Sequence, residues 1–315
     1  MHSPFSVFPR YYIKIIVTKH KLLRQPDCLM YTYFDKNCRK EFLRMSYKLI
    51  ALDLDGTLCN DEKAVTPRTA DALKQAQKHG IRVALASARP LHGLFREMHA
   101  IDCDKHHGIL IAYNGGKIVD ASTKEILSQT IIPHDLAVEV LHYLKDFPVS
   151  PIIDDGEQFY AESEDTYKLD HECSNNAMDC TIVPSLADAL DFDLVKILTS
   201  VQPEQLYDVL SVIGKPYEDR LEFVRTAPFY IEVMPKNIHK AASLQLVCEK
   251  LGIRPEEVIA FGDAENDLEM IQFAGHGVAM GNACDALKDA ADEVTLSNND
   301  DGIAHSLEHL LDFLS

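Results

Sequence analysis

Short apolar runs alternate with amphipathic stretches along residues 45–116. Each apolar run is too short for a helix and is bounded by turn residues, which is typical of buried strands. After the first run, Thr66 is a predicted N-cap and Pro67 the first residue of an amphipathic helix. Strands that alternate with helices in this way predict a parallel sheet with right-handed crossovers. The predicted strands span residues 48–52, 81–86 and 108–113.

The pattern changes in the middle of the chain, where strand candidates follow each other closely. Adjacent strands joined by tight turns predict an antiparallel sheet with helices, and therefore an inserted α+β domain. Alternation of helices and strands then resumes and continues to the last residues. The sequence thus predicts an α/β core of residues 45–116 and 234–315, interrupted by an α+β insert of residues 117–233.

Residues 1–44 differ from the rest of the chain in composition. They hold nine Lys or Arg against three acidic residues, and they show neither helical nor strand periodicity. We interpret them as an extension outside the folded domains; a targeting peptide and a small packed appendage are the alternatives. Their apolar stretch at residues 11–17 is short and contains a lysine, so no membrane span is predicted.

Composition narrows the class of protein. With 46% hydrophobic and 25% charged residues, the chain is predicted to be globular. A formal net charge of −18 disfavours nucleic acid and anionic membranes as partners. The eight cysteines show no CxxC spacing and are interpreted as reduced thiols of a cytoplasmic protein. The oligomeric state stays open.

Two acidic motifs follow predicted strands of the core. Asp53 and Asp55, with Gly56-Thr57 after them, come directly after the first strand, and the run from Gly262 to Asp267 follows a strand at residues 258–261. In an open parallel sheet, ligands bind outside the carboxyl ends of the strands. Four polar residues come just after core strands and are expected to converge there: Asp53, Ser87, Asn114 and Asp263.

Convergence of Asp53, Asp55 and Asp263 would bring negative charges together, so their site implies a cation. Ligands that are all oxygen atoms favour magnesium over zinc. Lys240 opens a predicted helix, where a lysine is mildly unfavourable with the helix dipole. It is either an ordinary solvated lysine or, with an anion bound at the helix terminus, a phosphate-charge stabiliser.

These motifs resemble the haloacid dehalogenase superfamily, specifically the Cof-type, subfamily IIB phosphatases with an inserted α+β (C2-type) cap and a Rossmann-like core. The resemblance covers residues 45–315. Its DxDGT motif is present as Asp53 to Thr57 and its GDxxND motif as Gly262 to Asp267, with Ser87, Asn114-Gly115 and Lys240 between them. The chain departs from the usual pattern at three positions, which bears on its rate: Ala88 and Ala241 stand where glycine is common, and Gly116 where alanine is common.

The resemblance implies a Mg²⁺-dependent phosphatase that acts on small phosphorylated metabolites, with sugar phosphates as the expected substrates. It implies Asp53 as nucleophile and Asp55 as general acid and base. It places Mg²⁺ on Asp53, the main-chain carbonyl of Asp55, and Asp263, with Asp267 orienting water or Lys240. The phosphate-binding residues it implies are Ser87, Lys240, Asn114, Gly115 and Asn266.

In the cap, Lys196 is a candidate substrate contact, with a solvated strand lysine as the alternative reading. Two other functions stay open. A phosphomutase would use the same aspartates, and a catalytically inactive phosphometabolite-binding protein would retain the fold.

Overall fold

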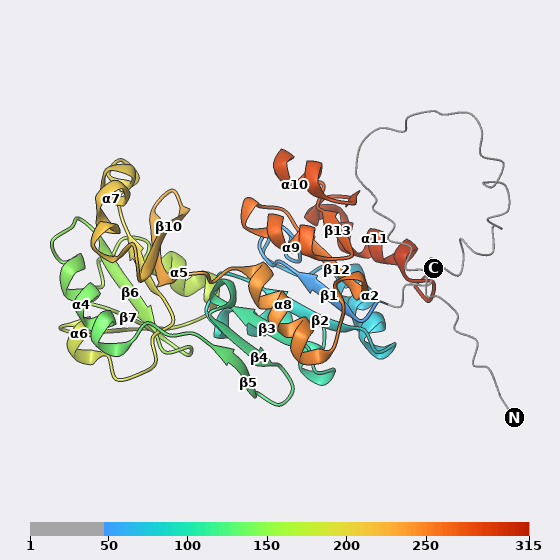
Figure 1. The fold of residues 1–315 in the computed structure, drawn as a ribbon, viewed down its shortest axis with the longest axis horizontal. Helices are drawn as coiled ribbons and strands as arrows, with labels where there is room; N and C mark the ends of the chain where they lie inside the picture. The colour runs from blue at the N-terminus through green and yellow to red at the C-terminus, as the bar shows by residue number, and fades with distance from the viewer. Residues whose placement is uncertain (1–46, 315) are drawn as a thin grey trace, which may run out of the picture. The chain divides into compact units, whose positions relative to one another are not determined.

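The computed structural model describes residues 47–314, so the prediction for residues 1–44 lies outside the described part of the chain. Within residues 47–314, no helix is long and apolar enough to cross a membrane. The chain forms an eight-stranded and a six-stranded sheet, each accompanied by its own helices (Figure 1). This arrangement confirms the predicted α/β fold class.

The eight-stranded sheet has the order β14-β13-β12-β1-β2-β3-β4-β5. Strand β1 lies near its centre and pairs in parallel with both β12 and β2. The parallel strands are β1 (Leu49–Leu52), β2 (Arg82–Ala86), β3 (Ile109–Ala112), β12 (Val258–Gly262), β13 (His276–Ala279) and β14 (Glu293–Val294). The carboxyl ends of the predicted strands therefore meet at one edge, as the sequence predicts.

Helices cover both faces of this sheet. Leu49 and Ala51 of β1 pack in a cluster with α8, α9 and α10, whereas Ile50 and Leu52 pack in a cluster with α2, α3 and α11. A strand buried on both faces needs apolar residues at every position, which explains its continuous apolar run. The helices are α2 (Pro67–Lys78), α3 (Phe95–Ala100), α8 (Lys240–Leu251), α9 (Leu268–Phe273), α10 (Asp285–Ala290) and α11 (Gly302–Leu310).

A hairpin of β4 (Lys117–Asp120) and β5 (Ile126–Gln129) completes the eight-stranded sheet. The sequence places these residues at the start of the insert, and the structure corrects this boundary. β4 pairs antiparallel with β3, and Ile118 packs in the same apolar cluster as β1 and α8. The tight turn does join two antiparallel strands, but they extend the core sheet.

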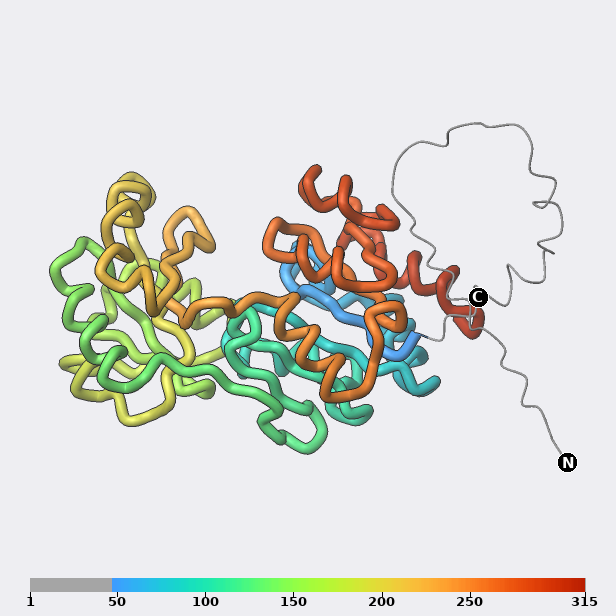
Figure 2. Tube along the Cα trace, viewed as in Figure 1, coloured from blue at the N-terminus to red at the C-terminus, as the bar shows by residue number. Residues whose placement is uncertain are grey.

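The six-stranded sheet, which we call the cap sheet, has the order β10-β11-β9-β6-β7-β8. Its pairs are antiparallel except β7 with β8. Figure 2 shows the chain passing into this part after β5 and returning before α8. Its strands are β6 (Ser150–Asp154), β7 (Phe159–Ala161), β8 (Cys180–Ile182), β9 (Ile197–Ser200), β10 (Leu221–Ala227) and β11 (Tyr230–Pro235). Its helices are α4 (His134–Leu144), α5 (Leu169–Asn176), α6 (Leu186–Ala189) and α7 (Leu206–Ile213).

Candidate active site

The loop after β1 brings Asp53 to the carboxyl edge of the core sheet. Its N–H donates a 3.1 Å hydrogen bond to the carbonyl of Phe261 in β12, so the side chain lies level with the end of that strand. The loop turns at Gly56, whose φ is +88°. A Cβ at Gly56 would lie 2.4 Å from Oδ2 of Asp263. Only glycine therefore allows the loop after β1 to approach the loop after β12 this closely.

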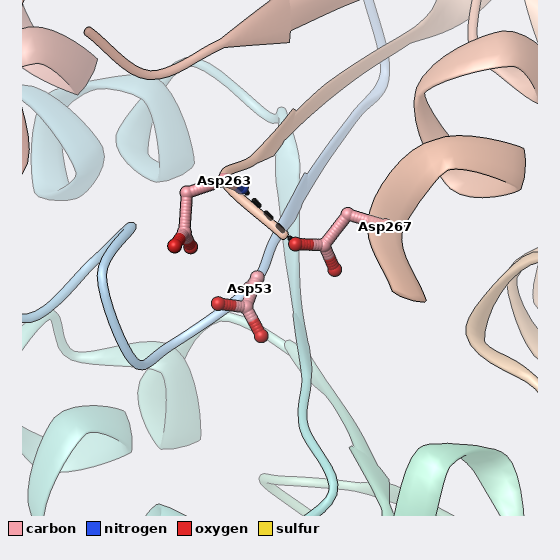
Figure 3. A group of neighbouring side chains, drawn as sticks. All are labelled: Asp53, Asp263 and Asp267. Atoms are coloured by element: carbon pink, nitrogen blue, oxygen red, sulfur yellow. Dashed lines mark hydrogen bonds between the residues drawn. The ribbon is translucent and has the colours of Figure 1, made fainter. Parts of the chain in front are cut away.

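Three carboxylates converge at this edge. Ligand oxygens of Asp53, Asp263 and Asp267 all lie within 4.8 Å of one another, and Figure 3 shows the three side chains as close neighbours. Thr57 Oγ1 donates a 2.7 Å hydrogen bond to Oδ1 of Asp263, which fixes the orientation of that carboxylate. Asp267 is completely buried. Like charges at this separation repel, so the group is stable only with a proton or a cation nearby.

The protonation of Asp53 reflects this crowding. Burial raises its pKa to about 8; the charge of Lys240 opposes the shift, and the carboxylates of Asp267 and Asp263 add to it. Burial also raises the pKa of Asp263. A raised pKa favours the protonated form of Asp53, whereas a nucleophile must be ionised. A cation beside Asp53 would restore the ionised form.

Lys240, the first residue of α8, lies inside this group of acids. Its side chain is 1% exposed, and its Nζ lies 2.5 Å from Oδ1 of Asp53 and 2.7 Å from Oδ1 of Asp267. The other oxygen of Asp267 accepts the N–H groups of Asp263 and Ala264, each at 3.1 Å. Lys240 is thus not a solvated lysine, and Asp267 orients it between the acids.

The residues after β2 and β3 lie beside Asp53. The register pairs Leu52 with Leu85, so Asp53 is level with Ala86 and Ser87 comes next. Ser87 is buried, and its carbonyl accepts a 2.8 Å hydrogen bond from the N–H of Asn114. Within residues 47–314, Oδ1 of Asn114 is buried without a hydrogen-bond partner, as expected of a group that awaits a ligand.

Gly115 brings the loop after β3 close to helix α8. Its φ is +114°, and a Cβ there would lie 1.7 Å from Oγ of Ser243. Glycine is therefore required at this position by both conformation and space. Asn266, by contrast, is exposed and stands outside the buried cluster.

Asp55 is held by two cations. Arg89 donates to both of its oxygens, at 2.8 and 2.5 Å, and Lys63 donates at 2.8 Å. Burial acts to raise the pKa of Asp55, but these contacts outweigh it and lower the pKa to about 2. Neither partner was predicted from the sequence. The available signal for Arg89 is its position two residues after Ser87, in the loop where the polar residues converge.

Lys196 is buried in the cap. It lies just before β9, its side chain is 4% exposed, and its Nζ donates to Glu232 at 2.8 Å. A second hydrogen bond, 3.0 Å long, reaches the carbonyl of Ala88, next to Ser87. The alternative of a solvated strand lysine is therefore wrong. Glu232 is a further residue that sequence reasoning missed, because nothing local marks it as the partner of a lysine 36 residues away.

Comparisons with known proteins agree with this geometry. The haloacid dehalogenase-like hydrolase family matches residues 50–307, and the chain belongs to this family. The chain is 33% identical over 263 residues to the Bacillus subtilis protein YcsE, a 5-amino-6-(5-phospho-D-ribitylamino)uracil phosphatase, covering 83% of this chain and 95% of that protein.

Solved structures give the same result. A haloacid dehalogenase-like hydrolase from Bacteroides thetaiotaomicron is 34% identical, with a TM-score of 0.82 over 84% of this chain and 100% of that chain. The subclass IIB sugar phosphatase BT4131 shares the fold, with a TM-score of 0.67 at 24% identity over 83% of this chain and 98% of that chain. The chain is a phosphatase of the haloacid dehalogenase-like family.

Proposed function

We propose that this phosphatase is a Mg²⁺-dependent phosphomonoester hydrolase that acts on small phosphorylated metabolites, with sugar phosphates and related polyol phosphates as substrates. The observation that carries the proposal is the buried contact of Asp53 with Lys240, 2.5 Å long, beside the carboxylate of Asp263. The relative YcsE supports the substrate class, because its named substrate carries its phosphate on a ribityl chain.

The donor set at the carboxyl edge of the sheet fits Mg²⁺. Lys240 donates to Oδ1 of Asp53 and Thr57 donates to Oδ1 of Asp263, and Oδ2 of each carboxylate would bind the cation. Asp53, Asp263 and the main-chain carbonyl of Asp55 would hold the ion, all through oxygen atoms. When bound, Mg²⁺ neutralises charge on the phosphoryl oxygens. Asp267 is fully occupied by Lys240 and two backbone N–H groups, which suits a supporting role.

The chain's own residues then carry out two displacements. Asp53 attacks phosphorus, the bond to the leaving-group oxygen breaks, and Asp55 gives that oxygen a proton, which leaves an aspartyl-phosphate on Asp53. Asp55, now ionised, takes a proton from water as the water attacks the aspartyl-phosphate and releases inorganic phosphate. Lys240, Ser87 and Asn114 bind the phosphoryl oxygens and stabilise their charge.

The contacts of Asp55 bear on both of its roles. With its pKa lowered to about 2 by Arg89 and Lys63, Asp55 is ionised at neutral pH, which suits the base role in the second displacement. The acid role in the first displacement requires a proton, so the carboxylate must exchange part of its contact with these cations for the leaving-group oxygen. Lys63 is half exposed and offers the partner that is easier to release.

Phosphate release from a panel of phosphorylated sugars, nucleotides and cofactors tests the proposal. It is measured with Mg²⁺ and with chelator, for the wild type, Asp53→Asn and the control Asp71→Asn, which changes an exposed aspartate on α2. We expect release that requires both Mg²⁺ and Asp53, and a control that matches the wild type. Turnover that persists in Asp53→Asn, or in chelator, would refute the mechanism.

A further inference from the structure

The two faces of the cap sheet differ in chemistry. Along β11, Ile231 and Val233 point to the face covered by α4, α6 and α7, where they join one apolar cluster. Glu232 lies between them and therefore points to the opposite face. Leu198 of β9 pairs with Glu232 and shares that face. The opposite face thus carries a buried charge, which a packing surface does not require.

Glu232 forms its ion pair with Lys196 beside the loop of residues 87–89, which we call the phosphate loop because it contains Ser87. The two side chains are 5% and 4% exposed, and the lysine also donates to the carbonyl of Ala88. Desolvating such a pair costs about as much as its attraction returns, so apolar residues of similar volume would stabilise the cap equally well. The pair contacts the carbonyl of Ala88, the residue after Ser87, and this position indicates a role in substrate binding.

Two buried acceptor oxygens of the cap lack a donor among the described residues. Oε2 of Glu232 and Oδ1 of Asn176 are without a hydrogen-bond partner in the part of the chain that the structure describes. Both residues are at least nine-tenths buried, at 4% and 3% exposure. Oδ1 of Asn176 lies against Gly93, which follows the phosphate loop in sequence. A Cβ at Gly93 would lie only 2.3 Å from this oxygen. Buried acceptors of this kind need a donor, and the hydroxyl groups of a ligand would supply it.

Three carboxylates, those of Glu232, Glu172 and Asp154, lie near the Lys196 ammonium, and we call these four residues the cluster. Their combined charge is negative. Asp154 Oδ1 accepts a hydrogen bond from the Tyr113 hydroxyl, 2.5 Å away, which ties this acid to the loop that carries Asn114. Three carboxylates around one ammonium repel a second anionic group on a ligand, since such a group would enter a low-dielectric site of its own sign.

We propose that Glu232 and Asn176 are specificity-determining residues that accept hydrogen bonds from hydroxyl groups of the leaving group. The cluster accordingly selects monophosphates of neutral polyols and rejects substrates with a carboxylate or a second phosphate. This inference rests on the proposed phosphatase reaction at Asp53.

Three phosphate esters test separately whether the site prefers hydroxyl groups and whether it rejects a second anionic group. Sorbitol 6-phosphate is an open-chain neutral polyol, 6-phosphogluconate replaces one terminal CH₂OH by a carboxylate, and n-hexyl phosphate lacks the hydroxyls. We expect the wild-type kcat/KM for sorbitol 6-phosphate to exceed each of the others by roughly tenfold or more, the worth of one hydrogen bond to a charged acceptor. Equal or faster hydrolysis of 6-phosphogluconate overturns the inference without any variant.

Glu232→Gln tests the residue directly. It should lower the preference for sorbitol 6-phosphate over n-hexyl phosphate by roughly tenfold and relax the rejection of 6-phosphogluconate. The matched control is Glu204→Gln, an exposed residue before α7, which should keep both ratios. If Glu232→Gln slows all three esters by one common factor, the pair only holds the cap in place and the inference is wrong.

Asn176→Ala provides a second variant, with the same expected loss of preference for hydroxyl groups. Hydrolysis of p-nitrophenyl phosphate distinguishes a failure of this inference from a failure of the proposed function. An enzyme that requires Asp53 and Mg²⁺ for this ester, yet shows no preference among the three esters, keeps the proposed function and loses this inference. An enzyme that hydrolyses none of the four esters contradicts both.

Discussion

Replacement of Lys240 by methionine is the sharpest perturbation of the site. The side chain is 1% exposed, and its Nζ lies between the carboxylates of Asp53 and Asp267 at 2.5 and 2.7 Å. Methionine fills most of the same volume and removes the charge. The variant therefore leaves two buried carboxylates without their common counter-ion.

The loss of stability can be estimated from this geometry. Removing one partner of a buried ion pair costs about 3–5 kcal/mol. Asp53 limits the cost by taking up a proton, because burial already raises its pKa to about 8. We expect the lower end, about 3 kcal/mol, and a fall in Tm of roughly 6–12 °C for a domain of this size. Thermal unfolding in chelator measures it, since no cation then replaces the lost charge.

The loss of activity has a separate cause. Lys240→Met removes a preorganised charge from the phosphoryl oxygens and favours the protonated form of Asp53, so kcat should fall by roughly 10²- to 10³-fold. Phosphate release at saturating Mg²⁺ measures this. Lys250→Met is the control, since it makes the same change at the exposed end of the same helix. The reasoning fails if Lys240→Met retains a kcat close to that of the wild type, or if its Tm matches that of the control.

Three further changes probe the surrounding structure. Gly56→Ala should weaken Mg²⁺ binding, because the φ of +88° costs roughly 1–2 kcal/mol for a residue with a Cβ and that Cβ would press on Asp263; the Mg²⁺ concentration for half-maximal activity should rise. Arg89→Met removes the guanidinium that lowers the pKa of Asp55 and so favours its protonated, acid form; kcat should therefore fall less for an alkyl phosphate, which depends on acid catalysis, than for p-nitrophenyl phosphate, and equal losses would argue against a role through Asp55. Asp154→Asn tests a pH dependence: burial raises the pKa of Asp154 from 3.8 to about 6, so the folded wild type binds more protons than the unfolded chain between these values and loses stability as pH rises through this range. Above pH 6 the variant should be more stable by roughly 2–3 kcal/mol, and at pH 4 it should not be; denaturant titrations at both values check this.

The strands that are buried on both faces could be predicted, because each of them requires a continuous apolar run in the sequence. Strand β1 and the predicted strands after it show this signal. Strand β14 does not, because it spans only Glu293–Val294 and is partly exposed. The hairpin of β4 and β5 could be predicted as a hairpin, since a tight turn is local information. The sheet that it joins depends on its pairing with β3 and on the burial of Ile118, which no local pattern shows.

The site was predictable for a related reason. Asp53, Ser87 and Asp263 follow parallel strands, and parallel strands bring their carboxyl ends to one edge. Arg89 and Glu232 act through partners that are 34 and 36 residues away along the chain, and an ion pair over such a separation leaves no periodic signal. Sequence reasoning thus locates the residues that stand at strand ends and misses those that hold them.

The backbone conformation at Ala88 and Ala241, which stand where glycine is common, indicates how these replacements affect the rate. Glycine is required where φ is positive, and neither Ala88 nor Ala241 has a positive φ. In the phosphate loop, the Ser87 hydroxyl accepts from the N–H of Arg89, the Ala88 carbonyl accepts from Lys196, and the Arg89 guanidinium donates to Asp55; none of these contacts involves the Cβ of Ala88. Ala88→Gly should therefore leave kcat unchanged; a rise of roughly tenfold, about 1.4 kcal/mol of barrier, would show that the methyl group crowds the phosphate.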